Sequence, residues 1–166
     1  MDSNIGAKER VTQKRLVGLF KNVLEYDYLG NWEYRESNDN VEEALLRRYL
    51  KRRKYADKEI DKAVAKFKQA AANIGAGLYN ASREVYTLLR YGVNVQSDVS
   101  ERKKTVHLID WANPMENDFQ IAEEVTVQGK SDRRPDLVVY VNGIAVAVIE
   151  LKRSTVSVHE GIRQNI

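Results

Sequence analysis

One stretch of the chain decides the fold: Asp136-Leu-Val-Val-Tyr-Val-Asn-Gly-Ile-Ala-Val-Ala-Val-Ile-Glu-Leu151. Two apolar runs flank Asn142-Gly143, a dipeptide typical of the tight turn that joins two antiparallel strands. Both runs are apolar at nearly every residue, which is the pattern of strands covered on both faces. The stretch therefore predicts a β-hairpin inside a sheet that is covered by helices.

Towards the N-terminus, the spacing of apolar residues predicts helices. One helical stripe lies between Arg10 and Tyr26, and polar residues 36–40 follow it. The next helix is expected after Asp39, which would cap it in a capping box with Glu42. Two more helices are expected, one from about Asp57 and one over residues 78–90.

After Gly92 the pattern changes to short runs with strand character, at 93–95, 105–109 and 119–127. The predicted fold class is therefore α/β, with a mixed central sheet flanked by helices. We expect a helical N-terminal segment at 1–40 and one domain from 41 to 166. Residues 158–166 have the pattern of a helix that stops without a cap, so we expect the chain to be a fragment of a longer protein.

Composition excludes several classes of site. The 166 residues include no cysteine and two histidines, which excludes disulfides, thiolate zinc sites and a histidine-rich metal cage. No apolar run is long enough to span a membrane, and the N-terminus lacks a signal-peptide pattern, so the cytoplasm is the expected compartment.

Positive charge is concentrated in one segment. The net charge is +3, yet residues 41–72 carry ten Lys/Arg and five Asp/Glu, which leaves a net −2 elsewhere. Such a segment suits a polyanion such as DNA, and a solvated helical face explains it equally well. The candidate DNA-binding residues in it are Arg47, Arg48, Arg52 and Arg53.

Polar residues at the ends of the hairpin are the candidates for chemistry. Asp136 precedes the first strand, and Glu150 and Lys152 end the second on one face of it. Two carboxylates at a sheet edge form a hard oxygen site that suits Mg²⁺ with a phosphate substrate. A lysine beside them would stabilise the attacking hydroxide or the charge that builds on phosphorus. The structural alternative is a surface ion pair, either Glu150 with Lys152 or Asp136 with Arg133 or Arg134.

These residues resemble the PD-(D/E)xK nuclease motif, with Pro135-Asp136 followed by Glu150-Leu151-Lys152. Gln164 resembles the glutamine of the Q-x-x-x-Y motif in the RecB-like branch, whose tyrosine would fall beyond residue 166. Longer strings are similar to the N-terminal nuclease domain of type I restriction enzyme R subunits. They are residues 89–93, 106–110, 117–125 and 133–154.

The resemblance implies a type I site-specific deoxyribonuclease, a restriction subunit that hydrolyses DNA phosphodiesters with Mg²⁺. Asp136 and Glu150 would hold the metal, Lys152 would act near the attacking water, and Gln164 would position DNA or these side chains. Glu42 matches the glutamate that an early helix often adds to RecB-like sites, although the capping box with Asp39 explains it as well. Arg153 and Ser154 join the candidate DNA contacts.

The partners that the resemblance implies are double-stranded DNA and the modification and specificity subunits of a restriction complex, with no membrane. ATP would bind only in the motor domains of the longer protein, which are absent here, so this fragment alone is expected to cut poorly. Two alternatives stay open: a repair nuclease of the RecB-like branch, and a non-catalytic DNA-binding or docking module of the same fold.

The hairpin register provides a test of the metal site. A two-residue type I′ turn at Asn142-Gly143 would place Asp136 opposite Ile149, so that Asp136 and Glu150 would point to opposite faces. A shared metal site excludes that arrangement. We therefore predict a three-residue loop with Gly143 in a G1 bulge, or else a bulge elsewhere in the hairpin.

Overall fold

The computed structural model describes residues 5–73, 75, 77–98, 102–126 and 133–151, with side chains from residue 10 onward. This part of the chain is mixed α/β and contains four α-helices and six β-strands. It divides into two compact units. Unit 1 comprises residues 1–39, 119–140 and 145–166, and unit 2 comprises residues 40–118 and 141–144. None of the described helices is long and apolar enough to cross a membrane.

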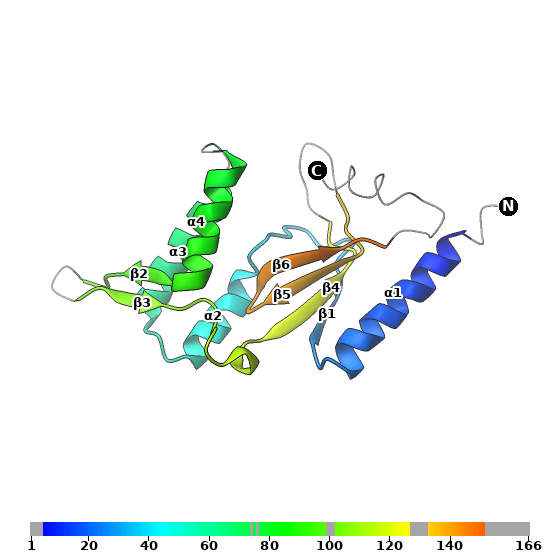
Figure 1. Ribbon diagram of the computed structural model, residues 1–166, viewed down its shortest axis with the longest axis horizontal. Helices are drawn as coiled ribbons and strands as arrows, with labels where there is room; N and C mark the ends of the chain where they lie inside the picture. The colour runs from blue at the N-terminus through cyan, green and yellow to red at the C-terminus, as the bar shows by residue number, and fades with distance from the viewer. Residues whose placement is uncertain (1–4, 74, 76, 99–101, 127–132, 152–166) are drawn as a thin grey trace. The chain divides into compact units, whose positions relative to one another are not determined.

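Unit 1 is built on a four-stranded mixed sheet in the order β1-β4-β5-β6 (Figure 1). Its elements are α1 (Ile5–Asn22), β1 (Asp27–Asn31), β4 (Phe119–Glu123), β5 (Leu137–Val141) and β6 (Ile144–Ile149). β1 runs parallel to β4. β4 and β5 are antiparallel, because the N–H of Glu124 donates to the Asp136 carbonyl and the N–H of Asn142 donates to the Asp118 carbonyl.

Alternating residues of the sheet enter two separate hydrophobic clusters. On one face Ile121, Leu137 and Val139 pack with Val17 of α1, which lies along this face in Figure 1. On the other face the cluster consists of Ala122, Val125, Val138 and Tyr140, with Leu29, Trp32 and Ala145 packed against it. Helix α1 and the segment after β1 therefore cover opposite faces, as the apolar pattern of β5 predicts.

The apolar sequence pattern of β6 does not predict the burial of its side chains correctly. β5 is buried along nearly its whole length, but Val146 and Val148 of β6 are 47% and 57% exposed. β6 is the edge strand of the described sheet. The prediction that both hairpin strands are covered on both faces is therefore wrong for β6 in this part of the chain.

Unit 2 is a helical layer with a two-stranded antiparallel sheet. Its elements are α2 (Glu43–Arg52), α3 (Asp57–Ala72), α4 (Leu78–Tyr91), β2 (Val93–Val95), β3 (Lys104–Val106) and the 3₁₀ turn η2 (Pro114–Glu116). Its core joins residues from all three helices to β2 and β3, with Leu50, Ile60 and Val93 fully buried. Figure 1 shows α3 and α4 side by side, with the β2–β3 hairpin at one end of them.

The predicted bounds of α3 and α4 are confirmed, including the end of α4 at Gly92. The predicted capping box of α2 is wrong, because the N-cap is Glu42 itself, and it makes no side-chain capping bond. The N–H of Glu42 instead donates to the Gly143 carbonyl at 2.7 Å, so the hairpin turn determines where α2 begins.

β1 is absent from the sequence prediction. Gly30 and the polar residues around it indicate a break, yet residues 27–31 form a strand with Gly30 at a φ of 108°. Residues of this strand are exposed or half-buried, so it lacks the apolar alternation by which a strand is detected from sequence. Its pairing with β4 supplies the stability that its composition does not indicate.

Candidate functional site

Asp136 and Glu150 lie at adjacent strand ends in unit 1. Asp136 immediately precedes β5, and Glu150 immediately follows β6. The N–H of Leu151 donates to Oδ2 of Asp136 at 2.5 Å. Because Leu151 is the next residue after Glu150, this bond holds the Asp136 carboxylate against the backbone that carries Glu150. The structure thus brings together the two predicted metal ligands at one edge of the sheet.

The hairpin turn is not the predicted three-residue loop. Asn142 and Gly143 have φ values of 53° and 80°, and β5 ends at Val141 while β6 begins at Ile144. Positive φ at both central residues is the signature of a type I′ turn, whereas a G1 bulge requires a negative φ at Asn142. The prediction of Gly143 in a G1 bulge is therefore wrong.

The alternative prediction, a bulge elsewhere in the hairpin, agrees with the packing of β6. Ala145 packs with Val138 and Tyr140 on one face, and Ile149 packs against Leu137 and Val139 on the other. In a regular strand residues 145 and 149 would share a face, since their separation is even. We infer one additional residue in β6, which has six residues against five in β5.

This additional residue decides the register of the carboxylates. The turn alone would pair Asp136 with Ile149, and one extra residue in β6 pairs it with Glu150 instead. We infer that Asp136 and Glu150 lie on the same face, as a shared metal site requires.

Asp136 is not held by the alternative ion pair with Arg134 that its sequence neighbourhood suggests. In the described part of the chain Arg134 pairs with Glu124, at 3.0 Å between Nε and Oε2, and with Glu33. Arg133 is exposed. The Asp136 carboxylate instead accepts the main-chain bond from Leu151, and its carbonyl accepts the bond from Glu124.

A buried amide from α1 supports this edge of the sheet. Gln13 is 8% exposed, and its Nε2 donates to Glu123 and Glu124 at 3.0 Å each. It also lies 3.5 Å from the carbonyl oxygen of Asp136. Sequence reasoning does not identify Gln13, although a polar residue one turn before Val17 on an otherwise apolar stripe is a signal that it has a polar partner.

A polar hollow of about 250 Å³ opens beside Gln13. It is lined by Arg10, Gln13, Lys14, Asn31, Glu33, Glu123, Glu124 and Arg134. One wall carries the hydrogen bond from the Tyr28 hydroxyl to Glu123 at 2.5 Å. Burial, together with this bond and the negative charge of Glu123, raises the pKa of Tyr28 to about 12. The phenol thus remains a donor to Glu123 throughout the physiological range.

The other predicted site residues fall in two groups. Lys152, Gln164, Arg153 and Ser154 lie outside the described residues. Glu42 is buried at the start of α2 in unit 2, where its main chain is fixed by Gly143. Among the described residues no group of three or more His, Asp or Glu side chains forms a ready metal cage. The candidate metal ligands described here are thus the pair Asp136 and Glu150.

Three of the arginines predicted to bind DNA are held in ion pairs within unit 2. Arg47 pairs with Glu43 at 2.8 Å and Asp61 at 2.6 Å. These acidic partners raise the pKa of Arg47, with the hydrogen bond that Arg47 donates to Asp61 contributing most. Arg52 pairs with Asp118 at 2.6 Å, and Arg53 pairs with Asp110 at 2.9 Å.

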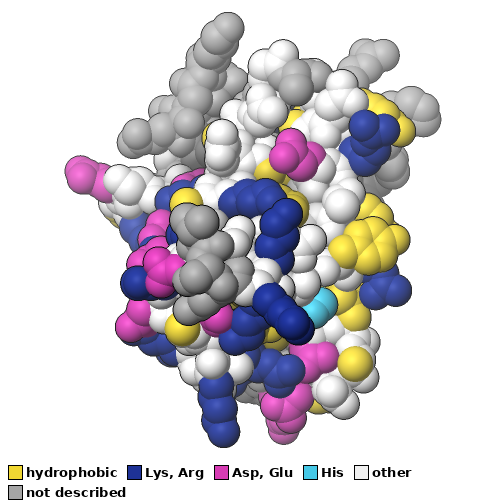
Figure 2. All heavy atoms as spheres, turned by 90° about the vertical axis from the view of Figure 1, so that its left-hand side faces the viewer, with side chains coloured by type: hydrophobic (Ala, Val, Ile, Leu, Met, Phe, Trp, Pro, Cys, Tyr) yellow, Lys and Arg dark blue, Asp and Glu magenta, His cyan; other side chains and the backbone are white. Residues whose placement is uncertain are grey.

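The fourth arginine, Arg48, is exposed. Figure 2 shows Lys and Arg side chains gathered in the middle of the face that carries the β2–β3 hairpin, with acidic side chains interspersed around them. The positive charge that sequence composition indicates is thus partly used to hold the unit together.

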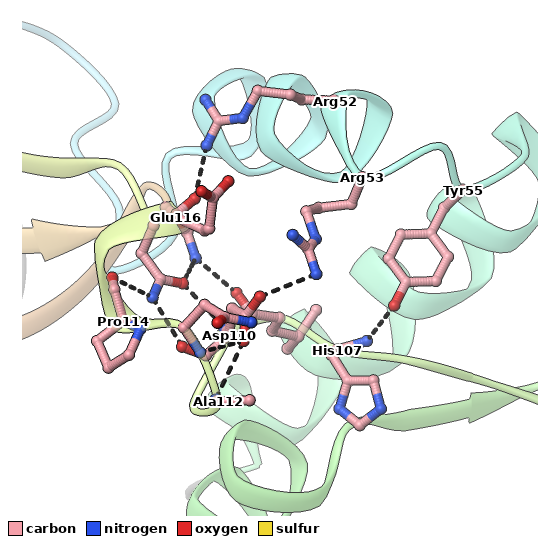
Figure 3. Close-up of polar contacts among 12 residues, drawn as sticks. Arg52, Arg53, Tyr55, His107, Asp110, Ala112, Pro114 and Glu116 are labelled. Atoms are coloured by element: carbon pink, nitrogen blue, oxygen red, sulfur yellow. Dashed lines mark hydrogen bonds and ion pairs between the residues drawn. The ribbon is translucent and has the colours of Figure 1, made fainter.

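Asp110 is the centre of a polar network that ties the loop after β3 to α2 (Figure 3). Its Oδ1 accepts from the main-chain N–H groups of Asn113 at 2.9 Å and Ala112 at 3.1 Å. The bond from Asn113 lowers the pKa of Asp110 most, burial opposes it, and the charge of Arg53 lowers it further. The side chain of Asn117 completes the network, because it accepts from the Asp110 N–H and donates to the Asp110 carbonyl.

Comparison with known proteins identifies the relatives of this chain. The family model for the type I restriction enzyme R protein N terminus matches residues 6–166. A protein of Methanocaldococcus jannaschii, named as the MjaIXP endonuclease subunit of a type I restriction enzyme, is 32% identical over 128 residues, 72% of this chain. The MjaVIIP endonuclease subunit of the same organism is 38% identical over 79 residues, 46% of this chain. These matches cover 12% and 7% of the relatives' lengths.

Proposed function

Because the chain belongs to the family of type I restriction enzyme R protein N-terminal regions, we propose that it is the Mg²⁺-dependent endonuclease domain of such a subunit. The resemblance on residues 133–154 leads to the same family. The domain would hydrolyse DNA phosphodiesters after ATP-driven translocation by other parts of a longer polypeptide. The chain spans about an eighth of its relative MjaIXP, so the whole enzyme's activity is part of the proposal.

The observation that carries the proposal is the hydrogen bond to the Asp136 carboxylate from the N–H of Leu151, the residue next to Glu150 in the chain. The Leu151 N–H holds the Asp136 carboxylate at the end of β6. We infer that one additional residue in β6 would turn Glu150 to the same face. A pair of carboxylates fits Mg²⁺, which takes one or two protein carboxylates and completes its coordination with substrate phosphate and water. When bound, Mg²⁺ polarises a phosphoryl oxygen and lowers the pKa of a coordinated water.

The supporting residues act on the position of Asp136. Gln13 and Arg134 neutralise or satisfy Glu123 and Glu124, the acidic neighbours on β4. Without these partners, the negative charges of Glu123 and Glu124 would repel the Asp136 carboxylate, and its position would be less well fixed. The main-chain bond between Glu124 and Asp136 fixes the start of β5 against β4.

The remaining roles rest on the family motif. We assign Lys152 to the attacking water, where its charge would stabilise hydroxide, and Gln164 to the positioning of DNA or of the other site residues. Glu42 is kept as an additional acidic candidate. The fold we propose is the PD-(D/E)xK core, in which β4, β5 and β6 form the catalytic part of the sheet.

The partners we propose are double-stranded DNA and the modification and specificity subunits of a restriction complex. Arg48, Arg153 and Ser154 are candidate phosphate contacts. Arg47, Arg52 and Arg53 can contribute to the potential around DNA, but each would have to exchange or share a carboxylate partner to contact a phosphate directly.

The test compares Asp136→Ala with Asp27→Ala, which removes an exposed carboxylate from β1 of the same unit. Both variants are made in the longer protein that carries this chain and are assayed for DNA cleavage with Mg²⁺. Mn²⁺ binding is measured on the same samples by electron paramagnetic resonance, which does not depend on activity. We expect Asp136→Ala to lose cleavage and to bind Mn²⁺ more weakly, while Asp27→Ala keeps both. Full cleavage by Asp136→Ala would favour a non-catalytic binding or docking module.

A further inference from the structure

The outward face of α4 carries alternating tyrosines and arginines. Four residues make this stripe: Tyr79, Arg83, Tyr86 and Arg90. Their spacing of three or four residues places them in one narrow row along the helix. Ala81 and Leu88, the buried residues of α4, lie on the opposite side of it. The stripe therefore plays no part in the core of unit 2.

Large side chains of the stripe are unusually exposed. Tyr79 and Tyr86 are 76% and 60% exposed. Arg83 lies over the Tyr79 ring with its Cζ 5.9 Å from the centroid. Arg90 lies over Trp111 at 5.4 Å, and the Trp111 Nε1–H donates to the Leu89 carbonyl, which fixes the ring against α4. Each guanidinium is thus held near an aromatic face, while its in-plane N–H groups remain available as donors.

The arginines of the stripe differ in their partners from Arg47, Arg52 and Arg53. Within the described ranges, no ion pair joins Arg83 or Arg90 to a carboxylate, whereas Arg52 and Arg53 each pair with an aspartate. An anionic ligand that binds Arg83 or Arg90 would therefore not have to displace an internal partner there. The stripe is therefore more accessible to an external anion than the ion-paired arginines of the basic segment at residues 41–72.

Charge favours a polyanion over a second copy of the chain. Lys and Arg outnumber Asp and Glu by four in unit 2, whereas acidic residues outnumber basic ones by one in unit 1. Two copies packed through this stripe would place arginines against arginines, which is unfavourable. An acidic protein surface would match the charge, but phosphates repeat regularly and require no particular fold of the partner.

We propose that the outer face of α4 contacts the phosphate backbone of duplex DNA, and this inference rests on the proposed function in taking DNA as the substrate. Arg83 and Arg90 are seven residues apart, or about 10.5 Å along the helix axis. That distance is close to the rise of three base pairs along the duplex axis, at about 3.4 Å each. Their N–H groups bind phosphate oxygens, and the hydroxyls of Tyr79 and Tyr86 supply further donors between and beside them.

The experiment measures binding of a fluorescein-labelled 20-base-pair duplex to the full chain by anisotropy over a series of salt concentrations. The test variant is Arg83→Ala/Arg90→Ala. The control is Arg15→Ala/Lys66→Ala, which removes the same charge from exposed positions on α1 and α3. Since all four side chains are exposed, folding should persist, and circular dichroism verifies it. A third variant, Arg83→Lys/Arg90→Lys, keeps the charge but not the planar N–H fork.

Loss of two phosphate contacts lowers the slope of log K against log salt by about 2. At about 0.1 M salt, this change in slope corresponds to an association constant for DNA that is roughly 60-fold lower. We expect this result for the alanine variant, a near-normal affinity for the control, and a normal slope with intermediate affinity for the lysine variant. A wild-type slope and affinity in the alanine variant, or an equal loss in the control, would overturn the proposal.

Two further arms separate the alternatives. If the alanine variant keeps DNA binding but loses binding to polyglutamate, the stripe serves an acidic protein and the proposal is wrong. Cleavage is scored separately with Mg²⁺ on Glu150→Ala in the longer protein. If the duplex binds through Arg83 and Arg90 but Glu150→Ala still cleaves, the proposed nuclease site fails while the DNA contact stands.

Discussion

Asn142 donates a hydrogen bond from Nδ2 to the carbonyl oxygen of Leu108 at 2.9 Å, although 34 residues separate them. The same nitrogen donates to Oδ1 of Asn117 at 2.8 Å, and Oδ1 of Asn142 accepts from the Asp118 N–H at 2.7 Å. Asn142 is fully buried. Residues 141–144 belong to unit 2, and Asn142 thus forms part of the polar core of that unit.

Two substitutions of Asn142 distinguish the contribution of its hydrogen bonds to stability from the contribution of its backbone conformation. Asn142→Ala loses all the side-chain bonds and places alanine at a φ of 53°. Buried partners left unsatisfied cost about 2–4 kcal/mol of unfolding free energy. Asn142→Gly loses the same bonds but accepts positive φ, so it should be more stable than Asn142→Ala by about 1 kcal/mol. Urea denaturation of both variants measures the difference, and equal stabilities would contradict the assignment of strain to this turn.

The carboxylate of Asp110 predicts a pH dependence at the acidic end. Its pKa is lowered in the folded protein by the Asn113 N–H and by Arg53, below the value of about 3.9 in unfolded chains. The folded state therefore binds fewer protons than the unfolded state between these two pKa values, and stability rises with pH there. The stabilisation is complete above about pH 4 and is lost as pH falls through the folded-state pKa.

Asp110→Asn removes this dependence. The variant should be less stable than the wild type at pH 7, and the difference in unfolding free energy should shrink as the pH falls below about 4. Denaturant titrations between pH 2.5 and 7 measure it, with Asp27→Asn, an exposed carboxylate, as the control. A difference that stays constant down to pH 2.5 would show that the charge of Asp110 contributes nothing to stability.

Tyr49 offers a substitution that should stabilise the protein. Its side chain is fully buried, and within the described residues its hydroxyl has no hydrogen-bond partner. Burial raises the pKa of this phenol, so the neutral hydroxyl is the group that is desolvated. Tyr49→Phe removes the unsatisfied group and keeps the ring, which also lies 5.5 Å from Arg52. We expect a gain of about 1 kcal/mol in thermal or urea unfolding, and a loss would indicate a hydrogen bond to the hydroxyl.

Gln13, in unit 1, offers a substitution that should destabilise the protein. Gln13→Ala leaves Glu123 and Glu124 without their shared donor beside Asp136. The expected loss is about 1–3 kcal/mol of unfolding free energy. Arg15→Ala, at a nearby exposed position on α1, is the control and should have a smaller effect. Equal stabilities of the wild type and Gln13→Ala would mean that water replaces the amide without cost.

The sequence predicts those parts of the fold in which local pattern and burial agree. β5 is apolar throughout and buried almost throughout, and α3 repeats Ile60, Val64 and Phe67 at helical spacing. For the site, the motif predicts that Asp136 and Glu150 share one sheet edge, and the hydrogen bond from the Leu151 N–H to Asp136 supports that prediction. In each of these cases a single local property determines the structure.

The remaining features depend on contacts between distant residues. β1 forms because β4 offers a parallel partner, and the start of α2 is set by the Gly143 carbonyl rather than by a cap from Asp39. The extra residue in β6 is invisible in a run of Ile, Ala and Val, since each residue suits either face. Arg52 and Arg53 read as free positive charges in the sequence because their partners, Asp118 and Asp110, lie far along the chain.

The most direct test of the central claim uses the longer protein that carries this chain, assembled with its modification and specificity subunits. Wild type and Glu150→Ala are compared on the same unmethylated DNA with Mg²⁺ and ATP, and both DNA cleavage and ATP hydrolysis are measured. The account predicts that Glu150→Ala loses cleavage and keeps ATP hydrolysis, because the carboxylate belongs to the nuclease site alone. Cleavage at the wild-type rate by Glu150→Ala would contradict the metal site and with it the proposed nuclease function.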